Sequence, residues 1–541
     1  MKRRVSAKMK VFILGALMLV LSIGLGANAD AVKAAEVVNA RDFGVTANEN
    51  SSQTADLHAA MRYFYDRGVE GTVYLPAGTY YFDEAIRFHA NVNLIGDGMG
   101  TTILKKIGSS PNYVVGNPIL HSNSTNLNAT ISDLTFDADR RNRAQQGLGQ
   151  VGGMNIDADV SNLTLDRVEV RDATIGALLR RLKDSEIRNS RFDLTSGHAI
   201  AFGSESHAVG DVRNNVITNN IITNSTGGSG INLSRATYTT VTNNQVINSV
   251  QQADSYGGIR IPNGGEHNTV SNNIVENYPR GIFVLSGAKN NVITDNTVRN
   301  SRIHGILIQA DGNKIAGNHI QQTNSSLQPE ALIRLAPGNN NEIQYNYLQT
   351  YDGFSNIGIR VTGTSSSNMI NDNIIDTAGT LVSIESGSNN TNNRNSNFFS
   401  GNGRFSFENR QSGKLLEVGN ADMTDGANVN QWAQTNCSCQ QWNLVENNDG
   451  YFGIVNANSG KALDVYNGNT TDGANVVQWT HHGGQMQQWK LKPNSAGYFM
   501  LINRNSGKAL DVEGKSVSDG GNVVQWTSNS GANQQWAISR N

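Results

Sequence analysis

The chain has 541 residues, of which 43 are basic and 45 acidic, giving a formal net charge of −2 at pH 7. Because this length exceeds what one ordinary core accommodates, we expect at least two domains. The balanced charge argues against nucleic acid as the main partner.

Residues 1–29 have the pattern of a secretory signal sequence. Five basic residues precede or begin an apolar run of 15 residues, Val11–Leu25, and Ala27-Asn28-Ala29 fits a small-residue cleavage site. The run is short for a membrane span, although an uncleaved anchor is the alternative interpretation. We therefore expect a secreted, extracellular protein without membrane contact once the signal is removed.

One helix is predicted near the start of the mature chain. Residues 52–66 carry apolar residues at helical spacing, and a strand at 72–75 and a turn at 76–78 follow. An open end of stacked strands invites edge-to-edge pairing, so we expect this helix to cap the repeated region beyond it.

From about residue 130 to residue 399 the chain repeats with a loose period of 22–30 residues. Segments 258–261, 281–284, 305–308 and 358–361 place glycine before alternating apolar and variable residues, the period-2 pattern of a strand. Stacked short strands of this kind predict a parallel β-helix.

One asparagine recurs in successive units of this region. The spacings are 24, 29, 23, 22, 28 and 27 residues, at Asn220, Asn244, Asn273, Asn296, Asn318, Asn346 and Asn373. A side-chain amide both donates and accepts, so stacked asparagines can form a structural ladder. Ligand binding by these amides is the less favoured interpretation.

The opening of the repeated region resembles a known superfamily. Asp42-Phe43-Gly44, the segment Gly71–Tyr80 and the segment Asn93–Gly98 are similar to pectate-lyase-like right-handed β-helix proteins, over about residues 37–400. The resemblance implies a right-handed rod. That superfamily includes polysaccharide lyases, glycoside hydrolases, epimerases and phage adhesins, so the fold does not fix the reaction.

Charged residues at outward strand positions suggest an anionic substrate. If Ile259 faces inward, Arg260 faces outward. Eliminative cleavage of a uronate chain needs a cation to neutralise the carboxylate, a base and an acid. We assign Arg181 and Arg260 to neutralisation, and Lys183, His198 or Tyr256 to proton transfer. The alternative is that all of these are solvated charges on coil turns.

The first hypothesis for function is thus a polysaccharide lyase acting on alginate or pectate. A glycoside hydrolase is the second, with Asp157 or Asp159 paired with Asp254 or Glu266. A non-catalytic adhesin is the third. No polygalacturonase-type aspartate pair and no Asp-Pro-His-Glu of the mannuronan-epimerase type is evident, which disfavours both classes.

No metal or other cofactor is expected from the sequence. Some β-helix lyases use calcium, but no acidic triad marks such a site here. The two cysteines, Cys437 and Cys439, are either free thiols or a strained disulfide between near neighbours.

All six tryptophans lie in the last quarter of the chain, in three pairs whose first members are 47 residues apart. Ser459–Val465 recurs as Ser506–Val512, and Gln-Gln-Trp ends each unit. These repeats resemble a ricin-type β-trefoil lectin over about residues 403–541.

This second resemblance implies different roles for the two tryptophans of each pair. Trp442, Trp489 and Trp536 would be structural, whereas the first of each pair would stack on a sugar beside an acid. We expect the best site in unit three, with Asp511, Trp526, Asn533 and Gln534, and the next in unit two, with Asp464 and Trp479. Unit one has Glu417 and Cys439 at the corresponding places and is the weakest candidate.

We therefore expect an all-β protein with a right-handed parallel β-helix at 37–400 and a C-terminal β-trefoil at 403–541. The expected form is a monomer whose partner is a polysaccharide.

Overall fold

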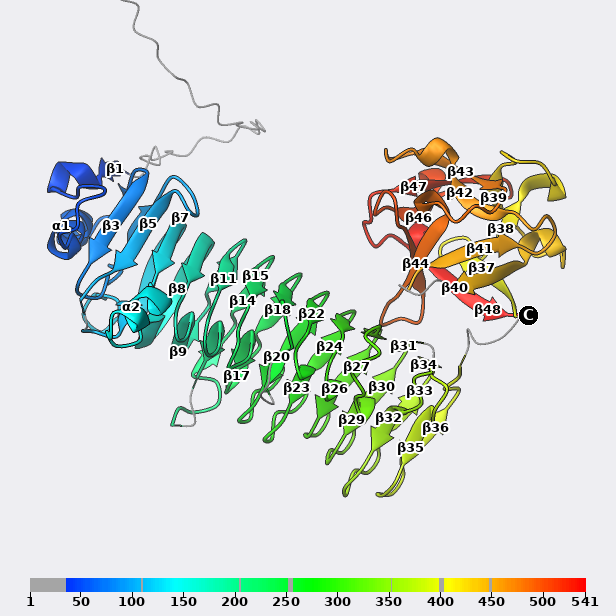
Figure 1. Cartoon of the computed structure of the whole chain (residues 1–541), viewed down its shortest axis with the longest axis horizontal. Coiled ribbons are helices and arrows are strands. Elements are labelled where there is room, and N and C mark those ends of the chain that lie inside the picture. Colours follow the sequence, from blue (N-terminus) through cyan, green and yellow to red (C-terminus); the bar gives the residue numbers. More distant parts are fainter. Residues whose placement is uncertain are drawn as a thin grey trace, which may run out of the picture.

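The computed structural model describes residues 36–541 except 109, 204–205, 252–255, 352, 398–402 and 447–449. The predicted signal sequence lies outside these residues. No helix in the described part of the chain is long and apolar enough to cross a membrane. The described chain forms a rod of stacked strands with a second, compact domain beside its C-terminal coils (Figure 1).

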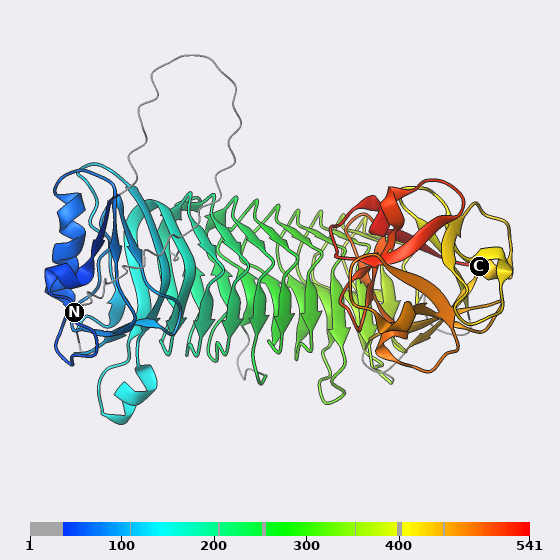
Figure 2. The same cartoon turned by 90° about the horizontal axis from the view of Figure 1, so that it is seen from above.

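The N-terminal end of the rod is covered by a helix, as predicted. After β1 (Glu36–Asn39) and a short 3₁₀ turn, α1 (Thr54–Tyr65) buries Leu57, Ala60, Met61 and Phe64. These residues recur at helical spacing and join the core of the first coils. The blue helix α1 therefore closes the end where strand edges would otherwise be exposed (Figure 2).

The rod has three stacks of parallel strands, one on each side. Stack one contains β1, β2 (Gly71–Tyr74), β4 (Val92–Ile95), part of β7 (Asn126–Asp137), part of β8 (Gly152–Arg171), β10 (Glu186–Arg188), β14 (Val216–Thr218), β18 (Thr240–Thr242), β21 (Thr269–Ser271), β24 (Val292–Thr294), β27 (Lys314–Ala316), β30 (Glu342–Gln344), β33 (Met369–Asn371) and β36 (Thr391–Asn393).

Stack two contains β3 (Gly78–Phe82), β5 (Thr102–Lys106), further parts of β7 and β8, β11 (Arg191–Asp193), β15 (Ile221–Thr223), β19 (Gln245–Ile247), β22 (Ile274–Glu276), β25 (Thr297–Arg299), β28 (His319–Gln322), β31 (Tyr347–Thr350) and β34 (Ile374–Asp376).

Stack three contains β6 (Tyr113–Val115), the start of β8, β9 (Ala177–Lys183), β12 (Ile200–Phe202), β16 (Ile231–Leu233), β20 (Gly257–Ile261), β23 (Arg280–Val284), β26 (His304–Ile308), β29 (Ala331–Leu335), β32 (Ile357–Val361) and β35 (Val382–Ile384). The short strands β13 (Val212–Arg213) and β17 (Ala236–Thr237) extend this side at the following bend.

The predicted asparagine ladder is confirmed at the bend between stacks one and two. Each amide nitrogen from Asn220 to Asn346 donates to the amide oxygen of the next asparagine at 2.9–3.0 Å, and Asn373 continues to Asn395 at 2.8 Å. A second ladder, which the sequence reading missed, runs from Asn268 to Asn390 at the bend before stack one. Buried amides thus satisfy one another and the bend carbonyls from coil to coil.

The C-terminal domain is an antiparallel arrangement of twelve strands in the described residues. They are β37 (Arg404–Asn409), β38 (Leu415–Val418), β39 (Val429–Trp432), β40 (Trp442–Glu446), β41 (Phe452–Asn456), β42 (Ala462–Val465), β43 (Ala474–Trp479), β44 (Gln488–Pro493), β45 (Phe499–Asn503), β46 (Ala509–Val512), β47 (Gly521–Trp526) and β48 (Trp536–Arg540). Four strands per unit in three units make the predicted β-trefoil.

The trefoil packs on the side of the last coils that carries stack two (Figure 1). Tyr347 of β31 is buried among the trefoil's core residues. Ser495 donates to Asp295 with its backbone N–H at 2.7 Å, and Lys490 Nζ donates to Gln321 at 3.1 Å. The trefoil and the outer surface of stack three therefore lie on different sides of the rod.

Candidate functional site

The outward positions of stack three form one continuous strip along the rod. The inward residues Ile200, Ile231, Ile259 and Ile282 are completely buried. Next to each of them stands an outward residue, in the register Ala201, Asn232, Arg260, Phe283. This alternation confirms the expected orientation of Arg260 and brings side chains of successive coils about 4.8 Å apart.

Three of the predicted site residues meet on this strip. The rings of His198 and Tyr256 lie edge to face with centroids 5.4 Å apart. The guanidinium carbon of Arg260 is 5.5 Å from the centre of the Tyr256 ring. A cation, a phenol and an imidazole are thus within reach of one bound sugar.

The protonation state of His198 follows from its surroundings. Burial, and next the charge of Arg260, lower the pKa of His198 to about 4, so the ring is neutral at pH 7. The backbone N–H of Ser229 donates to Nδ1 at 2.8 Å. Because Nδ1 accepts, the single ring proton resides on Nε2, and His198 offers an N–H donor.

Two neighbours of Arg260 belong to the same strip but were missed by the sequence reading. Asn232 lies beside Arg260 in the strand register, and its buried Oδ1 has no hydrogen-bond partner. Phe283, on the next coil, has the guanidinium groups of Arg260 and Arg280 over its ring at 5.9 and 4.8 Å. Both residues could have been predicted from the sequence, because each follows an inward isoleucine that is equivalent to Ile259 in the strand register.

Arg181 and Lys183 lie further along β9, away from this cluster. Lys183 Nζ pairs with the Asp159 carboxylate at 2.7 Å, and Arg181 Nε donates to the Asp157 carbonyl at 2.9 Å. Lys183 is five residues beyond Leu178, the residue aligned with Ala201, which is about 16 Å along a strand. The structure therefore brings His198, Tyr256 and Arg260 together, without these two.

The three described acids considered for hydrolysis each lie beside a basic side chain. Asp157 has Arg180 Nη1 at 3.6 Å and His207 Nε2 at 3.4 Å, Asp159 has Lys183, and Glu266 has Lys289 Nζ at 3.5 Å. Asp254 lies outside the described residues. No group of three or more His, Cys, Asp or Glu side chains suited to a metal ion occurs in the described chain.

In the trefoil, the second tryptophan of each pair belongs to the core. Trp442, Trp489 and Trp536 are completely buried, and their indole N–H groups donate to the carbonyls of Leu416, Leu463 and Leu510 at 3.0–3.2 Å. In contrast, Trp432 and Trp526 are 39% and 42% exposed. Burial thus distinguishes the structural tryptophans from the candidate sugar-stacking tryptophans Trp432 and Trp526.

Each trefoil unit places an acid beside the glutamine of its Gln-Gln-Trp sequence. Gln534 Nε2 donates to Asp511 at 2.8 Å, and Gln487 Nε2 donates to Asp464 at 2.9 Å. Asn533 Nδ2 donates to the Val512 carbonyl at 3.3 Å, while its buried Oδ1 has no partner. Burial raises the pKa of Asp464 and of Asp511.

A hollow lies beside the acid of unit two. A cavity of about 160 Å³ is lined by Asp464, Asn467, Gly468, Trp479, His482 and Met486. Its acid and its half-buried aromatic side chain, Trp479, are those expected of a sugar site.

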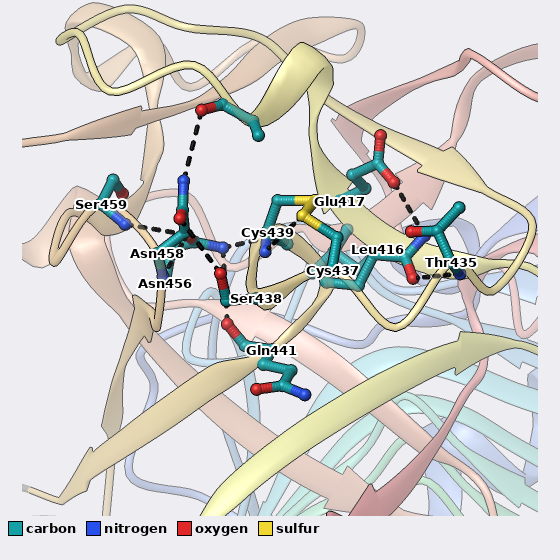
Figure 3. Close-up of a disulfide and its surroundings, with 12 residues drawn as sticks. Leu416, Glu417, Thr435, Cys437, Ser438, Cys439, Gln441, Asn456, Asn458 and Ser459 are labelled. Carbon is teal, nitrogen blue, oxygen red and sulfur yellow. Dashed lines mark hydrogen bonds between the residues drawn. A yellow bond between two sulfur atoms is a disulfide. The ribbon is translucent and has the colours of Figure 1, made fainter.

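Unit one differs because a disulfide occupies the corresponding segment. Cys437 and Cys439 are bonded, which decides between the two alternatives that the sequence left open. The disulfide lies next to Glu417, whose carboxylate accepts from Gln440 Nε2 at 2.7 Å (Figure 3). Burial raises the pKa of Glu417 as well.

Comparisons with known families agree with both parts of this architecture. Residues 37–260 match the model described as rhamnogalacturonase A/epimerase, pectate lyase-like, and residues 216–354 match the right-handed β-helix region. Residues 376–479 and 485–541 match the ricin-type β-trefoil lectin domain-like model. The chain therefore combines a right-handed parallel β-helix that is similar to pectate-lyase-like proteins with a β-trefoil that is similar to ricin-type lectin domains.

Individual relatives include alginate-modifying enzymes of Azotobacter vinelandii. Mannuronan C5-epimerase AlgE3 is 35% identical over 147 residues, which are 26% of this chain and 8% of that protein. Alginate lyase 7 is 31% identical over 147 residues, which are 25% of this chain and 17% of that protein.

Among solved structures, the A-module of mannuronan C-5 epimerase AlgE4 from the same organism is 19% identical, covering 67% of this chain and all of that module, with a TM-score of 0.49. The chain spans between 8% and 26% of the length of the curated relatives it matches.

Proposed function

We propose that this protein is a secreted enzyme that modifies a uronate polysaccharide of the alginate type, with the trefoil as its carbohydrate-binding domain. The observation that carries this proposal is the cluster of His198, Tyr256 and Arg260 on stack three of the rod. Support for the substrate class comes from relatives that are named as mannuronan epimerases and an alginate lyase.

In the proposed reaction, Arg260 holds the uronate carboxylate while a proton leaves C5. Charge pairing with the guanidinium group stabilises the negative charge that moves into the carboxylate. The neighbouring amide of Asn232 is placed to add a hydrogen bond. Tyr256 is the proton acceptor in this scheme: it acts as the phenolate, which takes the C5 proton and becomes the neutral phenol.

His198 then acts as a donor, since its only ring proton is on Nε2 and Nδ1 is occupied by Ser229. For β-elimination, the C4–O bond breaks, a C4=C5 double bond forms, and the departing oxygen takes the His198 proton. For epimerisation, a proton returns to C5 from the opposite face and no bond of the chain breaks. Both outcomes share the first step, and we propose elimination as this enzyme's outcome.

Product analysis separates the outcomes on one substrate set of polymannuronate, pectate and a neutral β-glucan. Elimination raises both reducing ends and the ultraviolet absorbance of the new double bond. Epimerisation in D₂O raises neither but places deuterium at C5, as proton NMR detects. Reducing ends without double bonds indicate a hydrolase, and no change on any polymer contradicts an enzymatic role.

Variants then test the cluster. We expect Tyr256→Phe and Arg260→Gln to lower kcat/KM at least about 100-fold, a typical loss for a proton-transfer or charge-stabilising group. The control is Arg191→Gln, which removes an exposed arginine that pairs with Asp193 at 3.4 Å on stack two. If the control and the two test variants turn over uronate equally well, the cluster is not the site.

A further inference from the structure

A second cluster of charged side chains lies further along the same strip of stack three. Arg334 follows Arg260 by three strands in the register Arg260, Phe283, Leu307, Arg334, and Arg360 comes one strand later. Three strand spacings correspond to about 14 Å. A polysaccharide lying along the rod would reach this cluster a few sugars away from the Tyr256 site.

The cluster surrounds a buried histidine that has no hydrogen bonds. His304 is 2% exposed, and neither ring nitrogen has a hydrogen-bond partner. Burial, followed by the charges of Arg280, Arg334 and Arg360, lowers its pKa to about 3. Such a group is costly to leave unpaired, so its presence requires an explanation.

The cluster binds the carboxylate of Glu330, and its Arg360 also pairs with Glu385 at 2.6 and 2.9 Å. Arg334 Nη1 lies 3.0 Å from it, His304 Nε2 lies 3.8 Å from it, and Arg360 also pairs with it. The Glu330 side chain is 40% exposed and comes from the segment just before β29, not from the strand itself. A carboxylate at the surface of the strip is therefore held by two guanidinium groups beside an unsatisfied imidazole.

We propose that this cluster is a second binding site for a uronate carboxylate, in which Glu330 occupies the ligand's place until substrate displaces it. The proposal rests on the proposed function for the identity of the ligand. Guanidinium groups bind planar carboxylates well, and a neutral imidazole can donate to or accept from a sugar hydroxyl. The site makes the enzyme favour long uronate chains over short ones.

The positions between the two sites are largely covered by neighbouring side chains. Phe283 and Leu307 occupy the two outward positions between Arg260 and Arg334, but they are only 8% and 3% exposed. The guanidinium groups of Arg260 and Arg280 lie over the Phe283 ring. A chain bound along the strip would therefore meet the arginines, which bind carboxylates.

The test uses two variants of the full-length protein that should act in opposite directions. Arg334→Gln removes a ligand of the carboxylate, so we expect the KM for a uronate octasaccharide to rise at least fivefold. Glu330→Gln removes the internal competitor, so the KM for the octasaccharide should fall at least twofold. The preference for octasaccharide over tetrasaccharide should shrink in the first variant and grow in the second.

Matched controls come from another ion pair on the rod. Arg394 Nη2 and Asp372 Oδ2 are 2.7 Å apart at a bend outside the strip. Arg394→Gln and Asp372→Asn repeat the same two charge changes and should leave the length preference unaltered. Thermal melting of all four variants confirms that each is folded.

A binding measurement that needs no turnover distinguishes failure of this proposal from failure of the proposed function. In native gels containing polymannuronate, Arg334→Gln should be retarded less than its charge control, and Glu330→Gln more. If the wild type turns over no uronate but these opposite shifts occur, the site stands and the enzymatic proposal fails. If both variants weaken binding, or neither changes it relative to its control, Glu330 and Arg334 form a structural ion pair and this proposal is wrong.

Discussion

The rod and the trefoil are both built from repeats, but they differ in how strictly the repeat is kept. In the trefoil, corresponding contacts recur in all three units. Lys414, Lys461 and Lys508 each reach the aspartate of a neighbouring unit at 2.6 Å. In the rod, unit length varies and only inward residues and bend amides recur. A closed ring of three units fixes its length, whereas an open stack tolerates insertions at its bends.

This difference determines how candidate functional sites are distributed in the two domains. Each trefoil unit carries an acid, a glutamine and two tryptophans at corresponding places, so its candidate sites are copies of unequal quality. The outward strip of the rod has no such copies, because nothing in the stacking requires an outward residue to repeat. Its candidate site is therefore a single asymmetric arrangement around Arg260.

The largest expected effect tests the division between the two kinds of tryptophan in the trefoil. Trp489→Ala removes a completely buried indole and its hydrogen bond to Leu463, and we expect a loss of about 3–5 kcal/mol of unfolding free energy. Trp526→Ala, at a 42% exposed position, should change stability by less than about 0.5 kcal/mol. Chemical denaturation followed by circular dichroism measures both.

The same pair of variants also separates structure from binding. Trp526→Ala should weaken retention on immobilised sugar although it remains folded, since it removes one stacking surface and leaves the hollow of unit two intact. Equal destabilisation by the two substitutions, or full sugar retention by Trp526→Ala, would contradict the assignment.

A smaller effect is expected from interrupting the rod's ladder. Asn296 donates to the Val270 carbonyl at 2.9 Å and to Asn318 at 3.0 Å, and it accepts from Asn273 at 3.0 Å. Asn296→Ala leaves the buried backbone N–H of Asn273 without its acceptor and should cost about 1–3 kcal/mol. Urea unfolding measures this loss, with Asn112→Ala at an exposed position as the control. Similar midpoints for the two variants would show that the ladder contributes little.

The ladder also illustrates which features of the rod can be predicted from the sequence. Counting one asparagine series located the bend between stacks one and two, because equivalent bends place amides one above another. The second series, beginning at Asn268, had comparable spacings and was available to the same method. Helix α1, the inward isoleucines and the trefoil repeat were likewise predictable, since each follows from periodicity alone.

The site could be predicted only in part, for a physical reason. The inward position of Ile259 implies that the Arg260 side chain points outward. It does not predict where a long strand bends from one side of the rod to the next. β9 continues past the strip, so Arg181 and Lys183 pair with Asp157 and Asp159 beyond it. Asn232 and Glu330 were missed because their importance depends on neighbours from other coils. Such contacts across coils depend on bend lengths, which vary irregularly from unit to unit.

The last prediction concerns pH, to which the two regions should respond in opposite directions. In the rod, burial lowers the pKa of His89 to about 4 and that of His304 to about 3. Below the unfolded value near 6.5, the unfolded chain binds protons that the folded rod does not, so stability falls as pH decreases. Between pH 7 and pH 5.5 each of these two histidines should cost about 1 kcal/mol. In the trefoil, the raised pKa values of Glu417, Asp464 and Asp511 have the opposite consequence.

For these acids the folded state binds the extra protons, so their contribution is present at low pH and is lost as pH rises through the folded pKa. The six tryptophans all lie in the trefoil, so their fluorescence reports its unfolding, whereas far-ultraviolet circular dichroism is dominated by the longer rod. On lowering the pH from 7 to 5.5, the circular dichroism transition should move to lower temperature while the fluorescence transition holds or rises. If the two transitions move together, the contacts of Tyr347 and Lys490 couple the regions into one unfolding unit. If neither moves, the buried histidines do not remain neutral in the folded rod.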